Sequence, residues 1–298
     1  MFDPDKVSLG ITPTGWTNDD FPAIGDSIPF EQCVSEIALA GFQGCSVGHK
    51  FPTDPETLRA ALELRGLRIT EPWVSTYFTA KGMRERTISE FQRQLAFIKA
   101  MGGTKIVVAE LGHAVHQQPV ALFSNKPVPD ETSWRTLLSG LEELGRMAAE
   151  QGMRLCYHHH MGTAVQNRAE VDRLLAGTDP ALVHLLLDTG HLRWAGDDPL
   201  ALAREHASRI KHVHLKDLRP EVLERSRRED LSFHDAVLAG IFTVPGDGML
   251  DFEPILGALA DAGYEGWLVV EAEQDPAKAH PLTYARKARE YLRKVTGL

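Results

Sequence analysis

The stretch Val183-His-Leu-Leu-Leu-Asp188 and the later run Ile210-Lys-His-Val-His-Leu215 decide the fold class. Each is a short apolar run of strand length, and a helical pattern separates them, which is typical of a parallel strand, helix and strand unit. Six more runs of this kind occur along the chain: Val7–Thr12, Phe42–Val47, Leu67–Trp73, Lys105–Ala109, Arg154–His160 and Trp267–Glu271. Eight strands, each followed by a helix, predict an α/β protein with a (β/α)₈ TIM barrel.

Helix signals between these runs agree with a barrel. Pro29 stands near a helix start, Gly41 stands just past its end, and the residues between them carry a helical apolar stripe. A second stripe runs from Trp134 to Met147 and stops before Gly152. Dividing 298 residues among the strand-and-helix units gives about 37 residues each, so one barrel domain accounts for residues 1–298.

Two connections are longer than a link from strand to helix requires. They are residues 111–130 and a long insertion at about residues 217–250, which contains Pro245-Gly-Asp-Gly248. Both follow the carboxyl ends of expected strands, where such barrels carry their active sites. We therefore expect the 217–250 insertion to cap the site and contribute to its pocket. The alternative is an ordered surface excursion with its own short helix at Phe233 to Ala239.

The composition excludes several classes of function. The 41 acidic residues outnumber the 32 Lys and Arg residues, and the net charge of −9 disfavours nucleic acid and anionic membranes as partners. The apolar runs are too short for a membrane span, and Met1-Phe-Asp-Pro-Asp is unlike a signal peptide. The three cysteines form no Cys-x-x-Cys pair, and no dinucleotide-binding glycine motif follows the first strand. We expect a cytoplasmic protein.

Four consecutive strands end in side chains that bind metals. The residues concerned are His158 and His160, Asp188 and His191, His212, His214 and Lys216, and Glu271 and Glu273. Alternate side chains of a barrel strand point inward, so residues of one parity converge on one cavity. A single His or Asp at a strand end is more often a hydrogen-bonding partner or a helix cap. Repetition on four strands predicts a divalent metal site, and the mixed nitrogen and oxygen ligands favour Mn²⁺ or Co²⁺.

These strand ends also resemble a known superfamily. Asp188-Thr-Gly-His191, His212-Val-His-Leu-Lys-Asp217 and Glu271 are similar to motifs of the xylose-isomerase-like sugar phosphate isomerases and epimerases. More narrowly, the chain resembles the inosose dehydratases nearly end to end. The strings that carry this resemblance are Tyr157-His-His-His-Met-Gly-Thr163, Phe242-Thr-Val-Pro-Gly-Asp-Gly248 and Val270-Glu-Ala-Glu-Gln-Asp-Pro276.

The superfamily resemblance implies a set of metal ligands. Asp188, His214 and Glu271 occupy the positions of three of them. The usual fifth-strand Glu is replaced by His158, so the fourth ligand is expected to be His158, with His160 and Glu110 as alternatives. The catalytic acid and base are expected among Glu271, Glu273, His158, His160 and His191. Ser46 stands where these barrels often carry a further Glu.

The resemblance implies dehydration of scyllo-inosose, which is 2-keto-myo-inositol, to 3D-trihydroxycyclohexane-1,2-dione in myo-inositol catabolism. A Lewis-acid metal, a base for the α proton and an acid for the β hydroxyl would serve this reaction. The substrate partner would be a small polyol ketone. The resemblance also suggests glutathione as a cofactor, and a homo-oligomer is expected. One alternative is a metal-dependent inosose or ketose isomerase or epimerase. An endonuclease acting on abasic DNA and a silent polyol-binding protein are less favoured.

Several further residues are expected to contact the substrate. They are Trp16, Asn18, Lys50, Trp73, Glu110, His160 and Lys216. Trp16 and Trp73 would wall the ring pocket, although aromatic core packing explains them about as well. A solvated loop lysine is the alternative for Lys50. For His212 we expect a place behind the ligands, and for Cys156 a small buried thiol.

Overall fold

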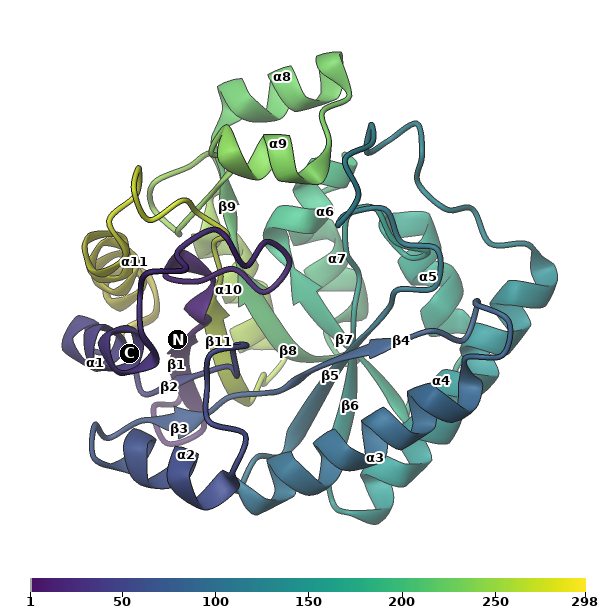
Figure 1. The fold of residues 1–298 in the computed structure, drawn as a ribbon, viewed down its shortest axis with the longest axis horizontal. Coiled ribbons are helices and arrows are strands. Elements are labelled where there is room, and N and C mark those ends of the chain that lie inside the picture. Colours follow the sequence, from purple (N-terminus) through teal and green to yellow (C-terminus); the bar gives the residue numbers. More distant parts are fainter. Residues whose placement is uncertain (1) are drawn as a thin grey trace.

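The computed structural model describes residues 2–298 and confirms the barrel (Figure 1). One sheet holds nine parallel segments in the order β3-β2-β1-β11-β8-β7-β6-β5-β4. Their bounds are β1 Val7–Ile11, β2 Gly44–Cys45, β3 Arg68–Ile69, β4 Trp73–Thr76, β5 Lys105–Glu110, β6 Arg154–His158, β7 Val183–Asp188, β8 Ile210–Leu215 and β11 Gly266–Val270.

The third stave of the barrel is broken into two pieces. β3 pairs with β2 and β4 pairs with β5, and the residues between them are Thr70, Glu71 and Pro72. Thr70 donates its backbone N–H to Cys45, and Pro72 accepts from Val107, so the broken stave is bonded on both sides. Because β3 and β4 together form one interrupted strand, the nine segments make a barrel of eight strands. The third expected strand is correct in place, but Pro72 interrupts it because proline cannot donate to a ladder.

Helices cover the outside of the barrel. They are α1 Phe30–Ala40, α2 Pro55–Glu63, α3 Arg84–Ala100, α4 Glu131–Glu150, α5 Arg168–Ala176, α6 Thr189–Ala195, α7 Pro199–His206, α10 Phe252–Asp261 and α11 Pro281–Thr296. The expected helix ends are confirmed where they were specific: α1 follows Pro29 and ends at Gly41, whose φ of 88° suits glycine. The main core lies between sheet and helices, and Val107, Cys156 and Leu186 form a small cluster of their own.

The 217–250 insertion forms a small folded unit above the barrel. It contains β9 Asp217–Leu218, α8 Pro220–Glu229, α9 Phe233–Leu238 and β10 Phe242–Thr243, with β9 and β10 paired antiparallel. Asp230 ties this unit to the other long connection, because its carboxylate accepts N–H bonds from Phe123 at 2.7 Å and Ser124 at 3.0 Å. Phe233 and Phe242 belong to a separate hydrophobic cluster there. Among the helices of residues 2–298, none has the length and apolar character needed to cross a membrane.

Candidate metal centre

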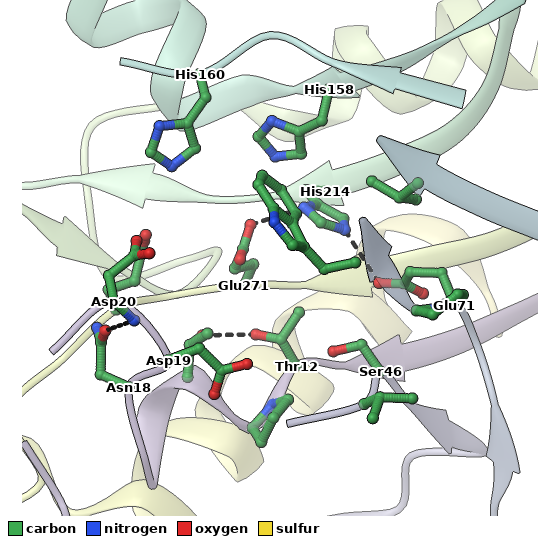
Figure 2. A pocket seen from close by; sticks show the side chains of 17 residues that line it. Thr12, Asn18, Asp19, Asp20, Ser46, Glu71, His158, His160, His214 and Glu271 are labelled. Carbon is green, nitrogen blue, oxygen red and sulfur yellow. Dashed lines mark hydrogen bonds and ion pairs between the residues drawn. The ribbon is translucent and has the colours of Figure 1, made fainter. Parts of the chain in front are cut away.

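A cavity opens at the carboxyl ends of the strands (Figure 2). Its wall includes the expected residues Asn18, Trp73, His158, His160, His214, Glu271 and Glu273. It also includes residues not singled out as ligand contacts from the sequence: Thr12, Asp19, Asp20, Ser46 and Glu71. The active face predicted from the strand ends is therefore the face that carries the cavity.

His158, Asp188, His214 and Glu271 meet at one point of this cavity. Each offers a donor atom, and these atoms lie within 4.8 Å of one another. The Nδ1 of His214 is 2.7 Å from Oε2 of Glu271 and 3.8 Å from Oδ2 of Asp188. The Nε2 of His158 is 3.5 Å from the same Asp188 oxygen. Parallel pairing explains part of this convergence, because Asp188 and His214 are register partners on β7 and β8.

The donor atoms of this cluster fit a divalent cation. Asp188 Oδ2, Glu271 Oε2 and His214 Nδ1 are buried, and their ion-pair contacts with one another and with Lys216 lack hydrogen-bond geometry within residues 2–298. The other oxygen of Asp188 accepts the N–H of His191 at 2.7 Å, which caps α6 and turns Oδ2 toward the cluster. Buried polar atoms are normally paired. Two imidazoles and two carboxylates left open toward one point match the ligands of Mn²⁺, Co²⁺, Zn²⁺ or Fe²⁺.

Lys216 lies buried behind the cluster and holds its carboxylates. Its Nζ donates to Glu273 at 2.7 Å and contacts Nε2 of His191 at 2.9 Å, and it lies 3.2 Å from Oε2 of Glu271. Burial opposes its charge, but Asp188, Glu271 and Glu273 together raise the pKa of Lys216. Burial raises the pKa of Glu273 to about 7, against the effect of Lys216. Lys216 thus contacts the carboxylates of the cluster and is not part of the cavity wall. The expectation that it contacts the substrate is therefore wrong.

His160 faces the cavity in a defined tautomer. Its Nδ1 lies 2.8 Å from the carbonyl oxygen of Met161, and a carbonyl only accepts, so Nδ1 carries the hydrogen and Nε2 keeps its lone pair. Burial lowers the pKa of His160 well below its ordinary value. Its ring packs 3.8 Å from that of His191 and 5.3 Å from Phe233. The neutral imidazole held in this way offers Nε2 as an acceptor, and its lowered pKa keeps the ring unprotonated while weakening it as a base.

Polar side chains from the first strands form the opposite wall. Asn18 Oδ1 accepts from the N–H groups of Asp20 and Phe21 at 2.8 Å each, while its buried Nδ2 has no partner within residues 2–298. Asp20 is held by Gln117 Nε2 at 2.7 Å. Figure 2 shows Asn18, Asp19, Asp20, Thr12 and Ser46 across the cavity from His158 and His160. This wall offers donors and acceptors to a polyhydroxylated ligand.

Trp73 stands at the edge of the cavity and remains 38% exposed. Its ring centroid lies 5.3 Å from that of His158 and 6.1 Å from that of His160, edge to face. The expectation that Trp73 walls the pocket agrees with this position.

Besides Lys216, three expected substrate contacts lie outside the cavity wall. Trp16 is 1% exposed and donates Nε1 to Glu36 at 2.7 Å, so it is a packing residue. Lys50 donates Nζ to the carbonyl oxygens of Gly25, Asp26 and Ile28. These two corrections have one cause, because residues beyond a strand end do not follow the alternation of the strand.

Glu110 is the third correction and is not an alternative metal ligand. Its carboxylate accepts the N–H groups of Phe78 and Thr79 at 3.0 Å each, and the hydroxyl of Thr76 at 2.8 Å. It therefore fixes the turn after β4.

His191 and the insertion lie behind the cavity rather than in its wall. His191 is fully buried, packed between His160 and Phe233. Phe242 lies 5.3 Å from the same ring. Within residues 2–298, the cavity wall contains no residue of the 217–250 insertion. The insertion supports the histidines from behind and does not form the pocket, contrary to the expectation, and its short helix α9 matches the alternative.

Glu71 is the main site residue that the sequence reasoning missed. Its carboxylate reaches two histidines of β8: Oε1 lies 3.2 Å from Nε2 of His214, and Oε2 lies 3.1 Å from Nε2 of His212. These contacts confirm the place expected for His212 behind the ligands. Pro72 was the sequence feature that could have indicated Glu71. A proline interrupts a strand, so the inward and outward alternation of side chains changes at the residue before it.

Comparison with known proteins identifies the family of this chain. Residues 19–295 match the family described as Xylose isomerase-like TIM barrel, which defines the class. An inosose dehydratase of Geobacillus thermodenitrificans (strain NG80-2) is 54% identical over 299 residues, covering 100% of both chains. An inosose dehydratase of Clostridium botulinum (strain Alaska E43 / Type E3) is 50% identical with the same coverage. The chain therefore belongs to the xylose isomerase-like TIM barrel family and, within it, to the inosose dehydratases, a family of enzymes.

Solved structures show the same fold at low sequence identity. The IolI protein with a bound zinc atom gives a TM-score of 0.70 at 15% identity, covering 97% of this chain and 98% of that chain. The probable 3-DHS dehydratase AsbF of Bacillus anthracis gives 0.72 at 14% identity, covering 96% and 98%. These likenesses confirm the expected barrel.

Proposed function

We propose that this protein is a metal-dependent hydro-lyase that converts scyllo-inosose to 3D-trihydroxycyclohexane-1,2-dione and water. The relationship to inosose dehydratases supports the substrate. The observation that carries the chemistry is the buried cluster of His158, Asp188, His214 and Glu271, whose donor atoms lie within 4.8 Å of one another, those of Asp188, His214 and Glu271 without a hydrogen-bond partner of good geometry within residues 2–298.

These four residues would hold one divalent ion, which we propose to be Mn²⁺ or Co²⁺. When bound, such an ion supplies Lewis acidity to a carbonyl oxygen and makes the neighbouring carbon acid easier to ionise. The mixed imidazole and carboxylate donors favour these ions over a thiophilic metal.

His160 is the proposed base for the α proton of the ketone. Its Nε2 lone pair is fixed by the Nδ1 bond to Met161, and the residue lines the cavity. Removal of the α proton by His160 leaves the electron pair on the enolate. Such a positioned base contributes about 10²- to 10⁴-fold to rate.

Glu273 is the proposed proton donor for the departing β hydroxyl. It lines the same cavity and receives a hydrogen bond from Lys216 Nζ at 2.7 Å. As the carbon–oxygen bond breaks, the enolate electrons form the new double bond and the hydroxyl leaves with the Glu273 proton as water. The resulting enol then ketonises to the dione. The sequence placed Glu273 among the catalytic candidates, and its position supports that role.

The substrate would lie between the ion cluster and the polar wall of Asn18, Asp20 and Ser46. Such a wall satisfies the hydroxyls of a cyclic polyol, and Trp73 covers one side of the ring. An epimerase would return a proton to the opposite face of the same carbon. His158 stands where relatives of the superfamily carry a second glutamate, and this favours elimination over epimerisation.

A metal-reconstituted assay tests the function. Chelated protein is reloaded with Mn²⁺, Co²⁺ or Zn²⁺ and supplied with scyllo-inosose, and the dione is followed by mass spectrometry. We expect dione only in the metal-loaded samples. Isomerised inosose as the sole product would instead support the epimerase. Parallel samples with and without glutathione, and sedimentation of the protein, test the expected cofactor and homo-oligomer.

A further inference from the structure

We propose that Glu71 is a positioning residue for the metal centre, which fixes the orientation and tautomer of His214. The inference rests on the proposed metal dependence. It concerns a residue on the third stave, outside the four residues that would hold the ion.

The broken stave gives Glu71 a fixed backbone. Its carbonyl accepts the N–H of Val47 at 3.2 Å, and its neighbours Thr70 and Pro72 are bonded to Cys45 and Val107. The break between β3 and β4 places the side chain in the cavity wall, where it is 2% exposed. A carboxylate in this position has little freedom to rotate away.

The contacts of Glu71 determine which nitrogen of His214 is free. A carboxylate only accepts, so the bond of 3.2 Å between Oε1 and Nε2 places the hydrogen of a neutral His214 on Nε2. The Nδ1 lone pair then points to the other side of the ring. There it lies 2.7 Å from Oε2 of Glu271 and 3.8 Å from Oδ2 of Asp188. Glu71 thus turns Nδ1 toward the point where an ion would bind.

The second oxygen of Glu71 lies 3.1 Å from Nε2 of His212, a fully buried residue two positions before His214 on β8. This contact is an ion-pair distance without hydrogen-bond geometry, so the carboxylate is hydrogen-bonded to His214 and lies beside His212. Partners of this kind behind a metal-binding histidine typically contribute about 10- to 100-fold to metal affinity.

Two other roles for Glu71 give different results in an experiment. Glu71, His212 and His214 offer a second group of donor atoms within 4.8 Å, so a second ion is one alternative. Direct substrate contact is another, because Glu71 lines the cavity. The first alternative predicts two ions per chain, and the second predicts a higher KM with unchanged metal affinity.

The decisive variants are Glu71→Met, which keeps the volume and removes the acceptor, and Glu71→Gln, which keeps one acceptor oxygen. Asp20→Asn is the matched control, since it changes another carboxylate of the same cavity. Metal affinity is measured by competition with a chelator, and the Co²⁺ form is followed by its visible absorption spectrum. We expect Glu71→Met to weaken Co²⁺ by about 10- to 100-fold and to change the spectrum. We expect the Co²⁺ affinity and spectrum of Glu71→Gln to lie closer to those of wild type, and those of Asp20→Asn, which changes a residue of the substrate wall and not of the ion cluster, to match them.

A measurement on the unmodified protein keeps the inference testable even if a variant does not fold. In zinc-loaded protein with ¹⁵N-labelled histidine, His214 should carry its hydrogen on Nε2. The opposite tautomer would overturn the inference. Binding of one ion by Glu71→Met with wild-type affinity and spectrum would also overturn it. The same holds if the wild-type protein binds two ions and Glu71→Met binds only one. Wild-type protein that binds no ion would overturn the proposed metal dependence as well.

Discussion

Binding of an ion by His158, Asp188, His214 and Glu271 should raise the unfolding temperature of the protein. A ligand that binds only the folded state stabilises it by about 2.7 kcal/mol at 100 times its Kd. At about 2.1 cal/mol/K per residue, the unfolding entropy of the 298-residue chain is roughly 0.6 kcal/mol/K. The quotient predicts a rise in Tm of about 4 °C.

The assay is scanning calorimetry of chelated protein before and after addition of Mn²⁺ or Co²⁺. Asp188→Asn should abolish most of the rise, because Oδ2 of Asp188 faces both His158 and His214. Asp20→Asn, on the same cavity but outside the cluster, should keep it. Equal rises in wild type and Asp188→Asn would show that the ion binds elsewhere and would refute the assignment.

Three further predictions concern other parts of the molecule. Lys105→Met should stabilise the protein by roughly 3 kcal/mol at pH 7. Burial lowers the pKa of Lys105 from 10.5 to about 8. Below that pKa the buried ammonium charge opposes folding, and methionine removes this charge. The penalty fades as the pH rises from about 8 to 10.5, so urea titrations of variant and wild type should converge near pH 10.5, and a gap that grows with pH would contradict this. His160→Gln should lower kcat by about 10²- to 10⁴-fold with unchanged metal content, and loss of the ion would instead place His160 among the ligands. Asp230→Gly, which suits the φ of 46° but removes the acceptor for Phe123 and Ser124, should destabilise the insertion by about 1–2 kcal/mol and speed hydrogen exchange in α8 and α9; unaltered exchange would mean that this link does not hold the insertion.

The alternation of the strands made much of the site predictable. His158, Asp188 and His214 lie within regular strands, and Glu271 directly follows β11. Parallel strands in register bring side chains of one parity to one place, so these four residues fell within the larger group of strand-end residues that alternation indicated, and the family resemblance selected Asp188, His214 and Glu271 from it. The same argument, carried through on β5, would have excluded Glu110. Val107 lies in the cluster with Cys156 and Leu186, and Glu110 is an odd number of residues away.

The remaining site depends on features that alternation does not govern. Glu71 lies in an interrupted strand, so its direction follows from the break at Pro72 and not from its parity. Trp16 and Lys50 lie in segments after strand ends, where hydrogen bonds to Glu36 and to carbonyl oxygens decide their orientation. Sequence patterns indicate where such segments begin, and tertiary contacts decide where their side chains point.

Under the proposed function, the residues that carry out the reaction and those that recognise the substrate come from different parts of the chain. The ion cluster, His160 and Glu273 all come from β6 or later, whereas Asn18, Asp20 and Ser46 follow the first two strands. The link at Asp230 joins the two long connections outside this recognition wall. Trp73 joins the residues that contact the ring hydroxyls to those that move its protons, because its ring packs against His158 and His160. Under the proposed function, Asn18, Asp20 and Ser46 are the positions at which substitutions would change the preference among cyclic polyols, with the later strands kept unchanged.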